Sequence, residues 1–255
     1  MVIIEKEYKI PSVIVDWAQS HSVPIMSYRD ADAPSSRDCL KGFNQNEFCL
    51  QDNLGTFSLN YDYVIEYSEE TSLDYLNMTY CHAHNLPATI VATERFIIRE
   101  IGIKDLDVYK RIINENPDVI FDKSLVNLSA EEFKERHLAY MKYSYQFLGY
   151  GIWGIFLIQK GNNKNTDYAK NIVDSTMIGI AGLDGTDVPQ LSYALFTEYQ
   201  GNGYAFEACD KVLEYAVSQL GLDKVIINIQ NDNPKSLILS KKLATKYPLL
   251  EIIIS

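Results

Sequence analysis

Residues 200–205 read Gln200-Gly201-Asn202-Gly203-Tyr204-Ala205 and stand between an apolar run typical of a strand and an amphipathic stretch typical of a helix. The two glycines let a loop turn its backbone N–H groups outward. The N-terminus of the following helix adds a partial positive charge. The junction is therefore predicted to hold an anion such as a pyrophosphate.

Three kinds of nucleotide-binding loop place glycines before a helix, and their spacing separates them. A dinucleotide fingerprint needs a third glycine where the helix packs on its strand, but Phe206 stands there. A Walker loop ends in Gly-Lys-Ser or Gly-Lys-Thr, which this stretch lacks. The pattern that fits is Gln/Arg-x-x-Gly-x-Gly/Ala, matched by Gln200, Gly203 and Ala205. On these residues alone, an ordinary strand-to-helix turn is an equal alternative.

The segments around the loop alternate between strand and helix patterns. Residues 191–196 alternate as a strand, and residues 205–220 carry an apolar stripe at helical spacing that Gly221 would cap. A buried strand is predicted at 224–229. Asn233 followed by Pro234 is a typical start of a last helix, which we expect to run to residue 243.

Upstream of the loop, the pattern predicts the elements that would complete one domain. Strands are expected at 95–101, 150–159 and 177–183, with a hairpin loop at 160–170. Helices are expected after Lys104 and over 130–147. His137 lies on the apolar face of the second helix and is interpreted as a packed histidine rather than a catalytic one.

These features together resemble the GNAT acetyltransferase superfamily, and in particular the branch of the ribosomal-protein N-terminal acetyltransferases. The resemblance covers residues 93–243 and rests on the glycine loop, on the phrase 94–101 followed by Asp-Leu-Asp at 105–107, and on Asn233-x-x-Ser236. One departure is Ala244-Thr245 after Lys242-Leu243, where this branch has Gly-Phe. The resemblance implies an α/β (α+β) fold with a central mixed, mostly antiparallel sheet flanked by helices.

The resemblance also implies acetyl-CoA as cosubstrate and direct attack of an amine on its thioester. By matched position, the loop would hold the pyrophosphate, and the strand before it would align the pantetheine and polarise the thioester carbonyl. For Asn233, a plain helix cap is an equal alternative. The cofactor-binding residues so implied are Leu195, Phe196, Gln200, Gly201, Asn202, Gly203, Tyr204, Ala205, Asn233 and Ser236.

Proton transfer is where the chain departs from its relatives. Many relatives carry a tyrosine as general acid at the position of Ser240. A serine is a poor acid at neutral pH, so the expected catalytic role of Ser240 is to hydrogen-bond the thiol or to relay a proton through water. Where relatives often have a glutamate before the loop, this chain has the neutral Gln190. The candidates for the catalytic base are Glu198, Tyr193 and Asp184, and for Glu198 a solvated loop carboxylate is the preferred interpretation.

Residues 1–92 are predicted to form a separate small α/β module in front of the acetyltransferase domain at 93–255. A strand is expected at 13–15, irregular structure at 29–56, a strand at 63–66 and a helix at 69–84. The module has a loose resemblance to haloacid-dehalogenase-type phosphatase folds. That class needs an Asp-x-Asp nucleophile at the end of its first strand, and Asp16 supplies only one carboxylate. Asp30-Ala31-Asp32 has the spacing, but it follows a tyrosine and an arginine in a polar segment rather than a clean strand end. A docking or substrate-shaping role is therefore favoured over a second active site.

Net charge and composition limit the classes of partner that the protein is expected to have. The formal net charge is −11, which argues against nucleic acid and favours an amine-bearing small molecule or peptide. No apolar run is long enough to span a membrane, and the start of the chain does not read as a secretory signal. We therefore expect a cytoplasmic protein whose four cysteines are free thiols.

Two further expectations concern metals and assembly. Cys81, His82 and His84 would not all face one way on a helix, so no metal site is expected. The terminal run 249–254 is a candidate for an exposed strand that pairs with a second copy in a homodimer.

Two functions follow from the sequence. The first is an acetyl-CoA-dependent N-acetyltransferase that acts on the primary amine of a peptide N-terminus or a small molecule. The second is a non-catalytic acyl-CoA-binding or sensor protein. Ser240 and Gln190 favour it, because they stand where relatives have a catalytic tyrosine and glutamate.

Overall fold

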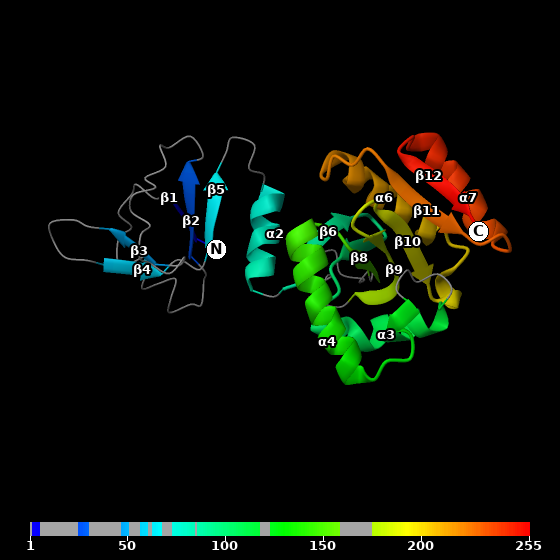
Figure 1. The fold of residues 1–255 in the computed structure, drawn as a ribbon, viewed down its shortest axis with the longest axis horizontal. Coiled ribbons are helices and arrows are strands. Elements are labelled where there is room, and N and C mark those ends of the chain that lie inside the picture. Colours follow the sequence, from blue (N-terminus) through cyan, green and yellow to red (C-terminus); the bar gives the residue numbers. More distant parts are fainter. Residues whose placement is uncertain are drawn as a thin grey trace, which may run out of the picture. The chain divides into compact units, whose positions relative to one another are not determined.

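The computed structural model describes residues 2–5, 25–30, 47–50, 57–60, 63–67, 73–84, 86–117, 123–158 and 175–255. The chain divides into two compact units, 1–86 and 87–255 (Figure 1). The boundary predicted from the sequence lies after Ala92, but β6 (Thr89–Ala92) pairs with β7 (Phe96–Arg99) in the sheet of the second unit. We describe each unit by itself.

The first unit contains a parallel sheet of three strands in the order β1-β2-β5, with β1 at Val2–Glu5, β2 at Ile25–Asp30 and β5 at Tyr63–Tyr67. The sequence predicted β5 and the helix α2 (Leu73–Ala83). The predicted strand at 13–15 lies outside the described residues, as does Asp16.

The prediction of irregular structure over 29–56 was wrong in two places. Strand β2 extends through Asp30, and β3 (Glu47–Leu50) forms an antiparallel pair with β4 (Phe57–Asn60). A strand of four residues offers too short an alternation to stand out between polar flanks. Strands β3 and β4 are defined by the backbone pairing between them rather than by a local sequence pattern.

The second unit is built on a sheet of seven strands in the order β12-β11-β10-β9-β8-β7-β6. Neighbours from β6 to β10 are antiparallel, while β10, β11 and β12 run parallel to one another. This confirms the mixed, mostly antiparallel sheet. The remaining strands are β8 (Ile152–Leu157), β9 (Thr176–Asp184), β10 (Gln190–Leu195), β11 (Val225–Ile229) and β12 (Leu250–Ile254).

Helices cover both faces of this sheet (Figure 1). One apolar cluster joins α3 (Leu106–Glu115) and α4 (Ala130–Tyr140) to the sheet, and another joins α6 (Tyr204–Ser218) and α7 (Pro234–Lys246) to it. Strand β10 lies between the clusters, with Leu191 and Leu195 packed toward α6 and Ala194 toward α3. The two faces of β10 therefore pack against different helix layers.

The predicted helix 130–147 is continuous but changes type. After Tyr140 the chain continues as a π-helix over Met141–Leu148, and Gly149 ends it with a φ of 75°. Such wider turns are frequent at functional sites. In this protein the π-helix carries Tyr143, which lines a cavity described below.

The terminal strand was predicted, but its pairing lies within the chain. β12 forms parallel pairs with β11 over its whole length, from Leu250 to Ile254. It is the edge of the sheet, and the side chains of Ile253 and Ile254 are exposed. No helix in the described ranges is long and apolar enough to cross a bilayer.

Candidate functional site

The glycine loop presents its backbone to open space. Gly201 and Gly203 have φ values of 78° and 80°, in the left-handed region that favours glycine. No described atom lies within 4 Å of the point that a Cβ on Gly201 would occupy. Gly203 is the N-cap of α6 and has no side chain to bond the first-turn N–H groups. These N–H groups are free to receive an anion.

Arg95, in the turn between β6 and β7, holds this loop. Its Nη1 donates to the carbonyl oxygen of Asn202 at 3.0 Å, and its Nε donates to Glu207 at 2.7 Å. The guanidinium also lies over the ring of Tyr204, 4.5 Å from its centre. A planar fork that makes all three contacts fixes the loop against α6. Arg95 is not among the site residues predicted from the sequence.

Beside the loop, the sheet opens between β10 and β11. In the described range 175–255, the register of the two strands pairs one position, Gln190 with Ile226. The side chain of Asn228 donates to Gln190 across the same end at 2.8 Å. Beyond this point the parallel strands diverge, so backbone groups along β10 have no partner strand on that side.

A cavity of about 640 Å³ joins this opening to the glycine loop. We call it the loop cavity. It is lined by most of the residues that the sequence assigned to the cofactor: Leu195, Gln200, Gly201, Gly203, Tyr204, Ala205, Asn233 and Ser236. The side chain of Gln200 donates to the carbonyl of Leu195 at 3.3 Å. The motif residues of the strand, the loop and α7 thus share one space.

Two predicted cofactor residues do not line the loop cavity. Phe196 is buried, with the guanidinium of Arg111 over its ring at 4.0 Å. Asn202 is exposed and bonds back to the carbonyls of Tyr199 and Gln200 through its side chain. Both residues support the shape of the loop.

The start of α7 supplies hydroxyl groups to the loop cavity. The Asn233 side chain accepts from the N–H of Ser236 at 3.0 Å, so Asn233 does cap the helix. The phenol of Tyr193 donates to the hydroxyl of Ser236 at 2.8 Å. Burial raises the pKa of Tyr193 to about 12, although the bond to Ser236 opposes the rise. Tyr193 is therefore a neutral phenol at physiological pH.

The other two catalytic candidates lie outside this arrangement. Ser240 is fully buried, and its hydroxyl donates to the carbonyl of Ser236 one turn earlier in α7, at 2.8 Å. Glu198 is exposed in the short turn after β10. Neither residue lines the loop cavity or the second cavity.

Further polar residues line the loop cavity, and all but Lys235 come from segments without a motif. They are Asn116, Lys123, Asn228, Gln230 and Lys235. Lysine is a common partner of phosphate groups. The position of Lys235, two residues after the helix cap and inside the Asn233-x-x-Ser236 motif, is the one signal in the sequence that could have found any of them.

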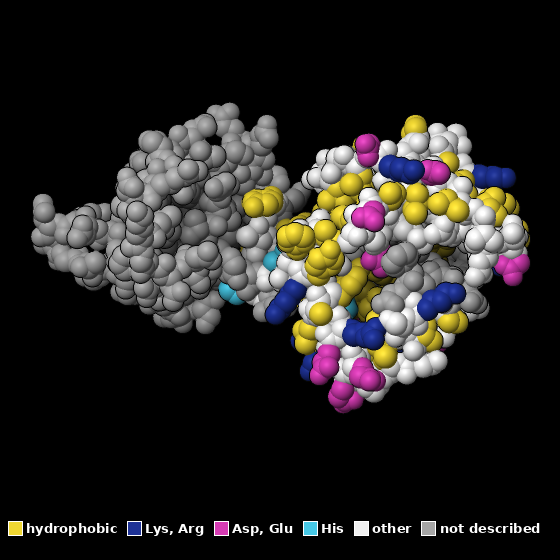
Figure 2. All heavy atoms as spheres, in the orientation of Figure 1, with side chains coloured by type: hydrophobic (Ala, Val, Ile, Leu, Met, Phe, Trp, Pro, Cys, Tyr) yellow, Lys and Arg dark blue, Asp and Glu magenta, His cyan; other side chains and the backbone are white. Residues whose placement is uncertain are grey.

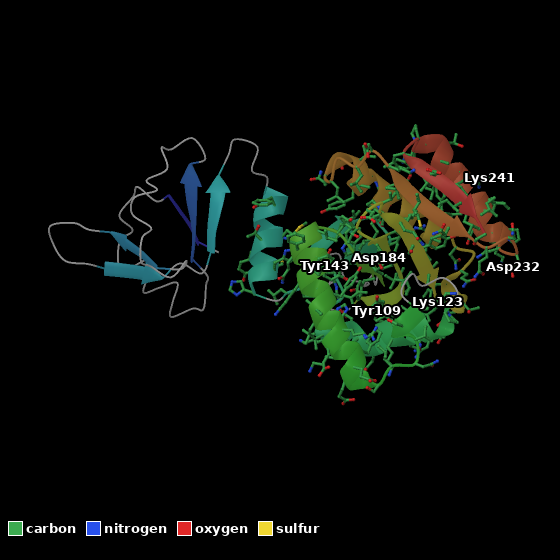
Figure 3. The ribbon with its side chains drawn as sticks, viewed as in Figure 1. Tyr109, Lys123, Tyr143, Asp184, Asp232 and Lys241 are labelled. Carbon is green, nitrogen blue, oxygen red and sulfur yellow. The ribbon has the colours of Figure 1, made fainter. Side chains whose placement is uncertain are left out.

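A second cavity, of about 710 Å³, lies on the α3 and α4 side of β10. We call it the aromatic cavity. Tyr109 of α3, Tyr140 of α4 and Tyr143 of the π-helix line it, together with Asp184 at the end of β9. Figure 3 labels Tyr109, Tyr143 and Asp184 here and Lys123 in the loop cavity. Ser192 and Tyr193 line both cavities, so the two spaces meet at β10.

Two ionisable rings of the aromatic cavity, His137 and Tyr140, are neutral. His137 bonds the carbonyl of Ile101 through Nε2 at 2.7 Å, and burial lowers its pKa. Burial, and then the charge of Asp184, raise the pKa of Tyr140 well above its usual value. The interpretation of His137 as a packed histidine is consistent with this environment. The Asp184 carboxylate stands against a wall of uncharged rings.

The remaining features are metal-ligating side chains and the distribution of charge on the surface. Among the residues that the structure describes, no group of three His, Cys, Asp or Glu side chains could hold a metal ion. On the face of the second unit drawn in Figure 2, basic and acidic side chains are interspersed rather than gathered by sign.

Comparison with known proteins gives a family for this fold. The model of the family "Acetyltransferase (GNAT) domain" matches residues 95–246. Similar solved structures include an acetyltransferase from Agrobacterium tumefaciens, which is 21% identical with a TM-score of 0.46 and coverage of 61% of this chain and 81% of that one. RimL, a ribosomal alpha-N-protein acetyltransferase in complex with coenzyme A, is 14% identical with a TM-score of 0.47 and coverage of 61% and 82%. A mutant of SpeG spermidine N-acetyltransferase from Vibrio cholerae is 15% identical with a TM-score of 0.46 and coverage of 59% and 79%.

Proposed function

The chain belongs to the acetyltransferase (GNAT) family of N-acetyltransferases, and from that premise we propose that it transfers the acetyl group of acetyl-CoA to a primary amine of a small molecule or peptide. The observation that carries the proposal is the single cavity that joins the glycine loop to the opening between β10 and β11. A pyrophosphate and an extended thiol-bearing chain need these two features side by side.

The residues of the loop cavity fit acetyl-CoA. The N–H groups of Gly201 to Ala205 would hold the pyrophosphate, since the left-handed glycines leave the backbone uncovered. Lys235 and Lys123 would add positive charge. Leu195 would offer its backbone to the pantetheine, with Asn233 and Ser236 along the opposite wall. Phe196 and Asn202 would act by shaping the loop.

Acetyl-CoA supplies an activated thioester, whose carbonyl carbon gains a bond to the amine nitrogen while its C–S bond breaks and CoA leaves as the thiol. The chain must take the proton that the amine loses, return a proton to the departing sulfur, and stabilise charge on that sulfur or on the carbonyl oxygen. Tyr193 is proposed as the donor of a hydrogen bond to that charge, its O–H turning from Ser236 to the ligand, because its phenol stays neutral and lines the loop cavity. A neutral phenol is not a base, so Tyr193 is not proposed for that role.

The aromatic cavity is proposed as the acceptor site, since it meets the loop cavity at Ser192 and Tyr193. Of the three candidates for the base, Asp184 is the carboxylate that lines this cavity. We assign it the proton that the amine loses. Glu198 and Ser240 have no proposed part in the chemistry.

Two measurements test the function. Isothermal titration of the full chain should show binding of acetyl-CoA, and absence of binding would remove the basis of the proposal. A thiol-release assay with a panel of small amines and peptides should then show turnover with at least one acceptor.

The non-catalytic acyl-CoA-binding protein stays the second candidate because Ser240 is buried and bonded within α7. Acetyl-CoA binding without release of CoA by any amine would favour it. The cytoplasmic location and the homodimer expected from the sequence remain predictions.

A further inference from the structure

The walls of the aromatic cavity are apolar along most of their depth. Besides four tyrosines, its lining includes Phe133, Ile152 and Ile180, and these three residues are buried. Its volume of about 710 Å³ lies within the range of small-molecule sites. Such walls favour a ligand with a hydrophobic body.

Charge is sparse inside this cavity. Among its described lining residues, Asp187 and Arg136 are exposed and stand at the mouth, while Asp184 is half-buried. His137 is neutral, as described above. One ammonium group therefore finds a carboxylate within the cavity. A second ammonium in the same space would face aromatic rings and lose its hydration without an ion pair.

Ser192 adds a polar group with no partner of its own. Its side chain is buried, and its hydroxyl is the one buried side-chain oxygen or nitrogen in the described residues without a hydrogen bond. A buried hydroxyl left unpaired destabilises a fold. Strand register places it opposite Gly182, and Gln190 opposite Asp184, so Ser192 and Asp184 are diagonal neighbours on adjacent strands. Side chains two residues apart share a face, and Ser192 lies on that of Ala194, toward α3.

We infer that the aromatic cavity binds a compact primary monoamine with an aryl or alkyl body, whose amino group is held between Asp184 and Ser192. This inference rests on the function proposed above and names its acceptor. The body of the amine packs against the rings of α3, α4 and the π-helix. The amine N–H groups donate to the Asp184 carboxylate and to the unpaired hydroxyl of Ser192, at the junction with the loop cavity.

Two other amine classes fit this site less well. A polyamine would bring further ammonium groups into a space with one half-buried carboxylate. A peptide would bring several amide groups, each of which needs a hydrogen-bond partner when it is buried. Both classes belong in the test as competitors.

The test measures equilibrium binding to the full chain in the presence of CoA. Phenethylamine should bind more tightly than spermidine, than a tripeptide with a free N-terminus, and than phenethyl alcohol, which has the same body without a charge. Asp184→Asn should weaken phenethylamine binding about tenfold. It should leave phenethyl alcohol and CoA binding unchanged. Asp223→Asn is the matched control, because it removes the same charge from an exposed residue outside both cavities.

Ser192→Ala separates a ligand-binding hydroxyl from a structural one. It should weaken phenethylamine binding severalfold while the melting temperature stays the same or rises, because the unpaired hydroxyl is gone. A lower melting temperature with unchanged amine binding would assign the hydroxyl to the fold and overturn its part of the inference.

The remaining outcomes distinguish this inference from the proposed function. Tighter binding of spermidine or of the tripeptide overturns the monoamine class, as does Asp184→Asn with unchanged amine affinity. Phenethylamine that binds through Asp184 but releases no CoA from acetyl-CoA supports the cavity assignment and contradicts the acetyltransferase proposal.

Discussion

The two cavities on either side of β10 recognise ligands by different means. The loop cavity works with backbone groups, which Gly201 and Gly203 uncover and Arg95 holds in place. The aromatic cavity works with side chains, which α3, α4, the π-helix and β9 bring together. Backbone recognition constrains residue type at fixed spacing, whereas a side-chain cavity depends on how distant elements pack. The first kind of site therefore leaves a motif in the sequence and the second does not.

The largest effect should come where the cavities meet. Tyr193→Phe removes the proposed hydrogen-bond donor and keeps the ring, so kcat should fall about 10² to 10³-fold with little change in KM. Steady-state kinetics of thiol release measure both constants. Tyr215→Phe is the matched control, because that tyrosine packs on Trp153 and lines neither cavity. Equal activity of the two variants would remove Tyr193 from the chemistry.

A smaller effect should separate the loop cavity from the rest of the fold. Gly203→Ala puts a Cβ on a residue with a φ of 80°, at the N-terminus of α6. Distorting this anion site should cost about 2 kcal/mol of acetyl-CoA binding, a factor of about 30. Titration calorimetry gives the dissociation constant.

Gly221→Ala controls for backbone strain, since Gly221 has a φ of 61° and lies away from both cavities. Both variants should lose about 1–2 kcal/mol of stability in urea unfolding. If the Gly221 variant also loses affinity for acetyl-CoA, general strain rather than the anion site explains the result.

A substitution of Arg95 tests whether acetyl-CoA binding depends on the shape of the loop or on the positive charge beside it. Arg95→Lys keeps the positive charge but cannot contact Asn202, Glu207 and the Tyr204 ring together. Acetyl-CoA affinity should fall about fivefold, equivalent to about 1 kcal/mol, because half-exposed ion pairs contribute little beyond their geometry. Unchanged affinity in the lysine variant would show that charge alone suffices.

The smallest effect concerns the wall of the aromatic cavity and its response to pH. Burial lowers the pKa of His137 in the folded state below its usual value of 6.5. The unfolded chain therefore binds the proton more readily, so this histidine lowers the free energy of unfolding as the pH falls below about 6.5.

His137→Gln should flatten that part of the stability curve, measured by urea unfolding between pH 7 and pH 5. Glutamine can still donate to the carbonyl of Ile101. A variant that keeps the full pH dependence would assign the effect to other groups.

Much of the fold could be predicted from periodicity and caps. The strand 191–196, the helix after the glycine loop and the Asn233 cap are local features, and the structure has all three close to the predicted residues. β6 was not predicted, because four residues after Pro87 carry no alternation that separates them from a loop. Its identity as a strand depends on pairing with β7.

The site divides in the same way. Gln200 to Ala205 could be found because glycine is required where φ is positive. The burial of Ser240 could not be predicted from the sequence, because its bond to Ser236 depends on how α7 packs. Likewise Tyr109, Tyr140 and Asp184 belong to three elements, and no spacing in the sequence relates them. Their neighbourhood is a product of sheet register and helix packing.

The single paired position between β10 and β11 also bears on how the domain opens. Strand pairing nearly stops there, so the segment β11-α7-β12 is joined to the rest largely through side-chain packing and through contacts with α6. Asp210 of α6 accepts from Lys246 at 2.6 Å, and its carbonyl accepts from the phenol of Tyr247 at 3.0 Å. We expect this segment to exchange its amide hydrogens as one cooperative unit, more readily than β8 and β9. Ligands that span the opening would slow that exchange and couple the two halves of the sheet.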